Sequence, residues 1–163
     1  MNIFKIKSFA KINLALNVIE KKLKLHKIES IISFIELHDL IYLKLTDKKN
    51  HKISFEGKHS QNIKKINTVT VLFKLLDQKK YLNNQKFEIK IIKNIPQEAG
   101  MGGGSMNAAS LISFFTKKKL LKLKNKELIK ITSQIGSDVI LGINPANTIL
   151  SSNGKIKKYN KNV

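Results

Sequence analysis

The chain has 163 residues, a formal net charge of +20 at pH 7 and no cysteine. This length fits one domain, or a small domain and part of another. The lack of cysteine excludes disulfide bonds, thiolate metal sites and cysteine nucleophiles. No apolar run approaches the roughly 18 residues of a membrane-spanning helix, and the N-terminus lacks the pattern of a signal peptide. The sequence therefore predicts a soluble cytoplasmic protein.

The positive charge comes entirely from lysine, which is scattered along the whole chain. Recognition of nucleic-acid bases and phosphates usually relies on the planar guanidinium of arginine, which this sequence does not contain. Aromatic residues are not interleaved with a basic face, as a protein that binds single strands would need. We therefore interpret the lysines as a solvated surface that attracts anionic ligands, and a nucleic-acid partner is not expected.

The first third of the chain alternates apolar and polar residues in five short segments, as half-buried strands do. We expect strands at residues 2–9, 11–19, 29–37, 40–46 and 51–57. The next periodic segment, residues 67–82, has the spacing of a helix. Its apolar face would contain Val69, Leu72, Phe73 and Leu76.

The second half of the chain mixes strands with helices. A strand is expected at residues 85–94, helices at 105–121 and 125–135, and a short strand at 147–152. Asn125 could cap the second of these helices. Because strands come first and helices mostly later, the fold class is predicted to be α+β rather than a regular βαβ array.

A glycine-rich loop stands between the strand at 85–94 and the helix at 105–121, and residues 100–104 hold four of the eight glycines. A flexible linker, a tight turn or a phosphate-binding loop would each explain it. The regular apolar segments on both sides argue against a linker. Glycine lets the backbone approach a phosphate, and the free N–H groups at the start of a helix suit an anion. A purely structural turn stays open.

The loop matches neither common phosphate motif. It lacks the Gly-Lys-Ser/Thr ending of a P-loop, and Ser105 stands where the dinucleotide fingerprint has its third glycine. Three further segments accompany it: "SFAKINLALNV" from Ser8, "LHKIESIISFIELHD" from Leu25 and "IGSDVILGI" from Ile135. Together with "PQEAGMGGGSMNAA" from Pro96, they resemble the motifs of the GHMP kinases in the same order.

GHMP kinases are small-molecule phosphotransferases that use ATP. Within them, the chain most resembles the branch that phosphorylates the 2-hydroxyl of 4-diphosphocytidyl-2-C-methyl-D-erythritol in the non-mevalonate route to isoprenoids. The segment "LHKIES" favours this branch over the homoserine and mevalonate kinases. The resemblance implies a mixed β-sheet packed against helices, a fold that the family shares with a ribosomal-protein domain. A basic RNA-binding module of the same fold therefore stays an alternative.

The resemblance also implies roles for individual residues. Asp138 would accept the proton of the acceptor hydroxyl, and Lys11 would steady the developing charge. Asn13 and His26 match positions that contact the cytidine-bearing substrate. MgATP would be the phosphoryl donor, although no carboxylate is assigned as a metal ligand. The ATP phosphates would be wrapped by backbone N–H groups of Pro96, Gln97, Glu98, Ala99, Gly100, Met101, Gly102, Gly103, Gly104, Ser105 and Met106.

Each of these residues also has a purely structural interpretation. Asp138 could cap a helix after Gly136, and Ser105 could either contact phosphate or magnesium or cap the helix that follows the loop. A single histidine such as His26 is more often a surface or packing residue. Lys11 is one of 31 lysines, and only its motif distinguishes it.

The chain departs from the family pattern at several positions. Leu25 replaces the aromatic residue that stacks on cytosine, Phe9 replaces a proline beside Lys11, and Met106 replaces a serine. Residues 140–142 replace a Pro-Phe-Phe sequence after Asp138. An inactive relative is therefore a further alternative.

The family carries a second, C-terminal domain that closes the acceptor pocket. We expect residues 1–163 to form the N-terminal ATP-binding domain, with the C-terminal domain absent. Such a chain should bind ATP weakly and turn over slowly, because an open site neither excludes water nor holds the reactants in line. Self-association or a second polypeptide could supply the other wall.

Overall fold

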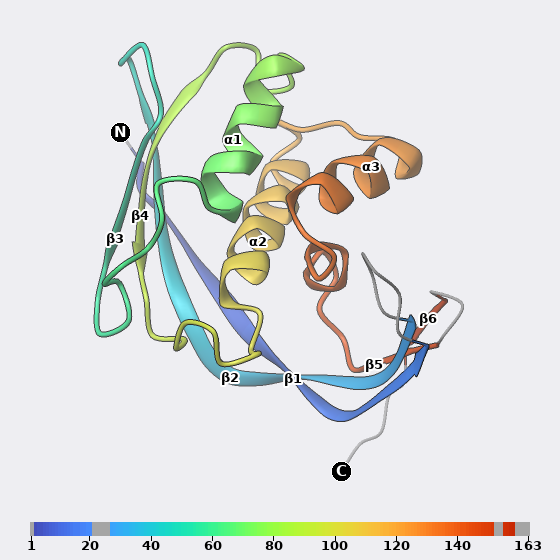
Figure 1. The fold of residues 1–163 in the computed structure, drawn as a ribbon. Coiled ribbons are helices and arrows are strands. Elements are labelled where there is room, and N and C mark those ends of the chain that lie inside the picture. Colours follow the sequence, from blue (N-terminus) through green and yellow to red (C-terminus); the bar gives the residue numbers. More distant parts are fainter. Residues whose placement is uncertain (1, 21–26, 152–154, 159–163) are drawn as a thin grey trace.

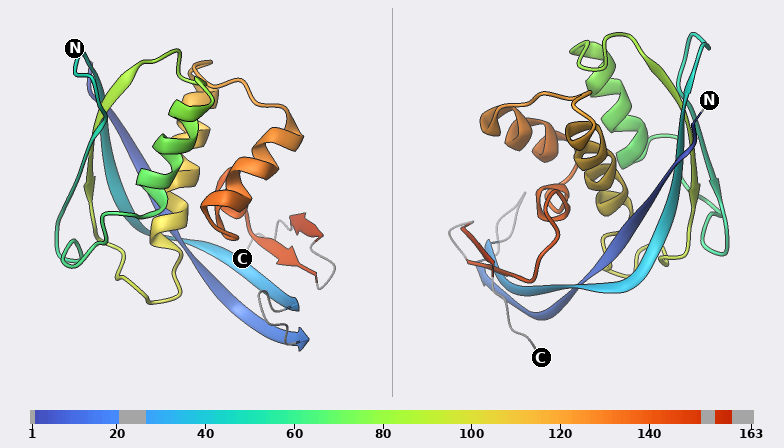
Figure 2. Two further views of the ribbon diagram at one scale, coloured as in Figure 1. Left: turned by 45° about the horizontal axis from the view of Figure 1, so that its top comes forward. Right: turned by 180° about the vertical axis from the view of Figure 1, so that it is seen from behind.

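The computed structural model describes residues 2–20, 27–151 and 155–158, and it contains one mixed sheet with helices on one face (Figure 1). Two further views show the same layering (Figure 2). The α+β class expected from the sequence is confirmed. The six strands are β1 (Phe4–Glu20), β2 (Lys27–Thr46), β3 (Lys52–Glu56), β4 (Lys86–Ile92), β5 (Thr148–Leu150) and β6 (Ile156–Lys158).

Strand β2 organises the sheet. Its second half, residues 40–46, pairs with β4, while residues 30–32 pair with β5, and β1 runs antiparallel along nearly its whole length. Strand β3 lies parallel to β4, so β3, the helix that follows it and β4 form a single β-α-β unit. In Figure 1 the long β1–β2 ribbon sweeps away from the helices and meets β5 and β6 at its far end.

The four strands expected before residue 47 are two long strands in the structure. The register of β1 against β2 shifts at three places, between Phe9 and Lys11, between Asn13 and Ala15, and between Val18 and Glu20. At the first shift, Ala10 and Lys11 are consecutive and both buried, so alternation fails there. The expected end of a strand at residue 9 falls at this first shift. Backbone pairing nevertheless continues through it.

The helices are α1 (Thr68–Gln78), α2 (Gly103–Lys117) and α3 (Asn125–Ile135), followed by the short 3₁₀ helix η1 (Val139–Gly142). The expected apolar face of α1 is confirmed, because Val69, Leu72, Phe73 and Leu76 are all buried. They pack in one core cluster with residues such as Ile41 and Ile89 of the sheet and Leu111, Ile112 and Phe115 of α2.

Helix boundaries differ from the sequence expectations at the end of α1 and at both ends of α2, which stops at Lys117 rather than at residue 121. Helix α1 ends at Gln78 rather than at residue 82, and α2 begins two residues earlier than expected, at Gly103. Asn125 is the first residue of α3 and not its cap. The side chain of Glu127 instead accepts the backbone N–H of Lys124 at 2.9 Å and so closes the start of that helix.

None of the helices in the described part of the chain is long and apolar enough to cross a membrane.

Candidate functional site

The glycine loop connects the end of β4 to the start of α2. Gly102 precedes the helix in a left-handed conformation, with φ 68°, and Gly100 is left-handed as well, with φ 71°. Glycine adopts this conformation without the steric cost that other residues meet. The N–H of Met106 makes a bond of 2.8 Å to the carbonyl of Gly102. The N–H groups of the three residues before it point out of the helix end.

A cleft of about 650 Å³ opens beside this loop. This volume lies within the range of small-molecule sites, about 300–1,000 Å³. One wall is the loop itself, from Pro96 to Ser105, and the opposite wall is the segment between β3 and α1. The floor includes Lys11, Asn13, Lys93, Asn107 and Asp138.

Lys11 and Asp138 meet in this cleft. The Nζ of Lys11 lies 3.1 Å from an Oδ of Asp138, and the exposed fractions of the two side chains are 7% and 36%. The same Nζ donates to Oδ1 of Asn13 at 3.4 Å, and Ser30 donates its hydroxyl to that oxygen at 3.2 Å. Lys11 and Asn13 of strand β1 therefore belong to one cluster of polar side chains, and the turn before η1 adds the carboxylate of Asp138 to it.

Lys11 is also joined to the glycine loop. Its backbone N–H donates to the carbonyl of Met101 at 3.1 Å. Its side chain lies against Gly102, where an added Cβ would come within 3.0 Å of the Lys11 Cγ. The two segments that the sequence singled out as separate motifs thus form one structural unit.

Asp138 does not act as a helix cap, which was the structural alternative for this residue. Asp138 precedes η1, but its carboxylate makes no capping hydrogen bond there and instead faces Lys11. Ser105 is likewise not a cap, because the residue before α2 is Gly102. Ser105 lines the cleft.

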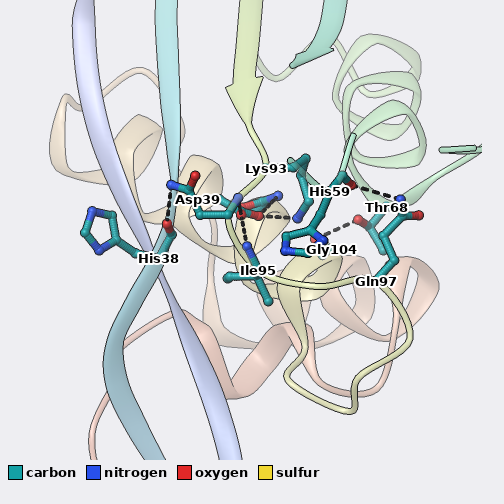
Figure 3. Close-up of polar contacts among 10 residues, drawn as sticks. His38, Asp39, His59, Thr68, Lys93, Ile95, Gln97 and Gly104 are labelled. Atoms are coloured by element: carbon teal, nitrogen blue, oxygen red, sulfur yellow. Dashed lines mark hydrogen bonds and ion pairs between the residues drawn. The ribbon is translucent and has the colours of Figure 1, made fainter. Parts of the chain in front are cut away.

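Two residues of the expected ATP loop point elsewhere. The side-chain amide of Gln97 donates to the carbonyls of His59 at 2.9 Å and Gln61 at 2.5 Å, so it ties the loop to the opposite wall (Figure 3). Met106 is buried, its sulfur packs near Gly142, and its N–H is taken by Gly102. His26, expected to contact the substrate, lies outside the described residues.

Gly103 and Gly104 line the cleft and are also tightly packed against neighbouring side chains. A Cβ on Gly103 would lie 3.1 Å from both the Ile95 Cγ2 and the Lys93 Nζ, and one on Gly104 would lie 3.1 Å from the Thr68 hydroxyl. That hydroxyl donates to the Gly104 carbonyl at 2.6 Å (Figure 3). Close approach of backbone to neighbouring side chains thus explains these two glycines.

Sequence reasoning missed the wall opposite the loop and a buried acidic residue at the inner end of the loop. The opposite wall includes Phe55, Ile66, Asn67, Thr68 and Val69, and no motif marks it. The only signal was the cap of α1, where the Asn67 side chain accepts two backbone N–H groups at 3.1 Å each. The buried acidic residue is Asp39, which the sequence placed only as the last residue of a motif.

Among the described residues, no group of three or more histidine or acidic side chains could hold a metal ion. Two carboxylates do line the cleft, those of Glu98 and Asp138. Mg²⁺ in phosphotransferases is commonly held by one or two carboxylates together with the phosphates of the substrate. The side chains present fit that arrangement better than an all-protein metal site.

Comparison with known proteins identifies related sequences. The family model described as the GHMP kinases N terminal domain matches residues 67–154, rather more than half of the chain. A 4-diphosphocytidyl-2-C-methyl-D-erythritol kinase from Pelagibacter ubique is 64% identical over 163 residues, which cover 100% of this chain and 58% of the relative. A kinase of the same name from Caldanaerobacter subterraneus is 35% identical over 93% of this chain and 52% of that protein. The chain thus spans little more than half the length of the curated relatives it matches.

Solved structures agree on the fold. A crystal structure of 4-(cytidine 5'-diphospho)-2C-methyl-D-erythritol kinase matches 96% of this chain and 55% of its own, with a TM-score of 0.72 and 19% identity. A mevalonate kinase from Methanococcus jannaschii matches 98% of this chain and 56% of its own, with a TM-score of 0.62 and 18% identity.

Proposed function

This chain belongs to the GHMP kinase family, and on that premise we propose that its cleft binds ATP in the cytoplasm and forms half of a phosphotransfer site. The acceptor in this proposal is the 2-hydroxyl of 4-diphosphocytidyl-2-C-methyl-D-erythritol, an isoprenoid precursor. Two relatives that carry this kinase name support the choice of acceptor. The observation that carries the proposal is the Lys11–Asp138 ion pair, which lies against the glycine loop.

The reaction needs a base, a way to neutralise charge and an aligned donor. In the proposal, the acceptor oxygen forms a bond to the γ-phosphorus of ATP as the bond to the ADP oxygen breaks. The hydroxyl proton passes to the carboxylate of Asp138, which is the more exposed member of the ion pair. Lys11 stays largely buried beside it and steadies the negative charge that develops on the oxygens.

The donor would occupy the part of the cleft between the loop and the opposite wall. The helix end of α2 presents free N–H groups and the positive end of its dipole, which suit phosphate oxygens. Phe55, Ile66 and Val69 give the opposite wall an apolar character that suits a flat base. Mg²⁺ bound with ATP would neutralise phosphate charge, and Glu98, the cleft carboxylate that is not paired with Lys11, could contribute an oxygen ligand.

The acceptor would approach from the side of Asn13. Its side-chain oxygen is held by Lys11 and Ser30, which leaves the amide NH₂ available as a donor to a substrate oxygen. Asn13 and Asp138 line the same cleft, so an acceptor held by one lies near the other.

The proposal is tested by measuring ATP consumption by the 163-residue chain with three acceptors in parallel: the cytidyl methylerythritol compound, mevalonate and homoserine. We expect turnover, however slow, only with the first. Turnover with mevalonate or homoserine would assign the chain to another branch of the family. RNA affinity that falls steeply with salt, together with no ATP binding, would instead support a basic RNA-binding module.

A further inference from the structure

Asp39 takes no part in the chemistry proposed above, yet its side chain is completely buried at the inner end of the glycine loop. It lies in β2 opposite Ser8, beside the point where β2 begins to pair with β4. A buried carboxylate is costly unless charges and hydrogen-bond donors compensate it. Its partners therefore show which parts of the chain it holds together.

Four donors meet this carboxylate, and they come from both ends of the loop. Oδ1 accepts the backbone N–H groups of Asn94 at 2.8 Å and Ile95 at 2.9 Å, just after β4. Oδ2 accepts a hydrogen bond from the ammonium of Lys93, the first residue after β4. It also accepts one, at 2.9 Å, from the side-chain amide of Asn107 in the second turn of α2. Figure 3 shows Lys93 and Ile95 converging on Asp39. One side chain thus connects the strand that enters the loop to the helix that leaves it.

The ion pair also determines what Lys93 can do. Lys93 lines the cleft with an exposed fraction of 5%, and its Nζ lies 3.1 Å from the position of a Cβ on Gly103. Because Asp39 neutralises this ammonium, Lys93 brings little net charge to the cleft. Attraction of phosphate at this end then depends on backbone N–H groups that are fixed in place before the ligand arrives.

We propose that Asp39 is a positioning residue that fixes the backbone of the glycine loop for phosphate binding. It acts through Lys93, Asn94, Ile95 and Asn107 and touches no substrate. This inference rests on the proposed ATP-binding function of the cleft.

The test compares Asp39→Asn with Asp77→Asn in the 163-residue chain, using calorimetric titration with MgATP and amide hydrogen exchange. Asp77 is a suitable control because it is also paired, with Lys86 at 2.7 Å and His51 at 3.1 Å, but it lies at the other end of α1 from the loop. We expect Asp39→Asn to weaken MgATP binding about tenfold or more, since hydrogen bonds to a charged group are lost. Exchange should accelerate at residues 94–105. Asp77→Asn should leave MgATP affinity unchanged.

Other outcomes would overturn the inference. If Asp39→Asn bound MgATP with wild-type affinity, the inference would be wrong. It would also be wrong if this variant bound MgATP more tightly and with a steeper salt dependence, because Asp39 would then act only as a counter-ion to Lys93. Equal loss in both variants, in proportion to their loss of stability, would indicate a general structural role. If Asp39→Asn does not fold, Asn107→Ala removes one of the four donors and should weaken MgATP binding about threefold, as the loss of one hydrogen bond would. Unchanged binding in Asn107→Ala would then count against the inference.

The proposed function can fail separately. If the wild-type chain does not bind MgATP, the ATP proposal is wrong. The positioning role of Asp39 is then judged by amide exchange alone. Unchanged exchange at residues 94–105 in Asp39→Asn, or in Asn107→Ala, would overturn it.

Discussion

Asp138 and Lys11 differ in how far they are open to solvent, and this difference matches their proposed roles. The carboxylate is 36% exposed and can meet an acceptor, whereas the lysine side chain is 7% exposed. The backbone N–H of Lys11 also donates to the carbonyl of Met101, which holds this residue in place. A residue that receives a proton must be reachable, while one that stabilises charge benefits from burial and a fixed position.

The first prediction concerns Asp138→Asn. The amide cannot accept the acceptor proton, so turnover should fall by roughly 10²–10⁴-fold. MgATP affinity should stay nearly unchanged, because the carboxylate lies on the acceptor side of the cleft. The measurement is steady-state ATP consumption together with a binding titration. Asp47→Asn, at an exposed position after β2, is the matched control, and the hypothesis fails if both variants behave alike.

A second prediction uses the difference between Gly100 and Gly103. A Cβ on Gly100 would contact nothing within 4 Å, and Gly100 lines the cleft. Asn tolerates the left-handed conformation, so Gly100→Asn should change the free energy of unfolding by less than about 1 kcal/mol. It should still weaken MgATP binding by blocking phosphate approach.

Gly103→Val, in contrast to Gly100→Asn, should mainly lower stability. Its side chain would crowd Ile95 and Lys93, so the free energy of unfolding should fall by about 1–3 kcal/mol. Thermal unfolding and MgATP titration on both variants separate these effects. Unchanged MgATP affinity in Gly100→Asn would favour a loop that is only a structural turn.

At the scale of elements, a polar cluster away from the cleft joins the residue before β3 to α1 and β4. The Nδ1 of His51 accepts the N–H of Phe87 at 3.0 Å, and its Nε2 lies 3.1 Å from the Asp77 carboxylate. Since Nδ1 accepts, the neutral ring carries its proton on Nε2. A second proton would remove the acceptor for Phe87.

This cluster predicts how stability depends on pH. Burial lowers the pKa of His51 below its usual value of 6.5, with the Asp77 carboxylate opposing the shift. The unfolded chain therefore binds a proton more readily than the folded chain below about pH 6.5. The contribution of neutral His51 to the free energy of unfolding should therefore be fully present above that pH. It should be lost as the pH decreases through the pKa that His51 has in the folded chain.

Denaturant unfolding between pH 5 and 7.5 checks this dependence. Asn at position 51 can still accept the Phe87 N–H but does not titrate. His51→Asn should therefore flatten the dependence on pH. A variant that keeps the wild-type slope would show that another group causes it.

The same scale shows how far the sequence could predict the structure. The helices were predictable because their apolar faces face a single core, as Leu72 and Phe73 do in α1. The long strands were not, since alternation fails at Ala10 and Lys11 and so resembles the end of a strand, although the pairing of β1 with β2 continues beyond it. The hydrogen-bond network of Asp39 could not be predicted from the sequence either. Its donors lie 54 to 68 residues further along the chain, and only folding brings them together.

At the scale of the whole molecule, the far part of β1 exposes several large apolar side chains. Their exposed fractions are 60% for Leu14, 51% for Leu16, 49% for Val18 and 52% for Ile19. Soluble monomers rarely expose contiguous apolar patches larger than a few hundred Å². The 163-residue chain should therefore associate as its concentration rises, and Leu16→Lys with Val18→Lys should reduce this association. Sedimentation velocity at several concentrations provides the measurement, and a chain that stays monomeric at all of them would contradict the prediction.

The relatives are longer than this chain, which covers 58% of the Pelagibacter kinase. We propose that a polypeptide of residues 1–163 alone binds ATP weakly and turns over slowly. An open site gives up part of the advantage of alignment and water exclusion, which can reach several kcal/mol. A second polypeptide, or the remaining part of the relative, would restore that advantage.

The most direct test joins residues 1–163 to the remaining C-terminal part of the Pelagibacter kinase and measures phosphorylation of 4-diphosphocytidyl-2-C-methyl-D-erythritol by ATP. The account predicts clear turnover in this hybrid, much slower turnover in the 163-residue chain, and near loss of turnover when the hybrid carries Asp138→Asn. A folded hybrid that binds MgATP but phosphorylates no acceptor, or one that is unaffected by Asp138→Asn, would contradict the central claim that Lys11, Asp138 and the glycine loop form the phosphotransfer site.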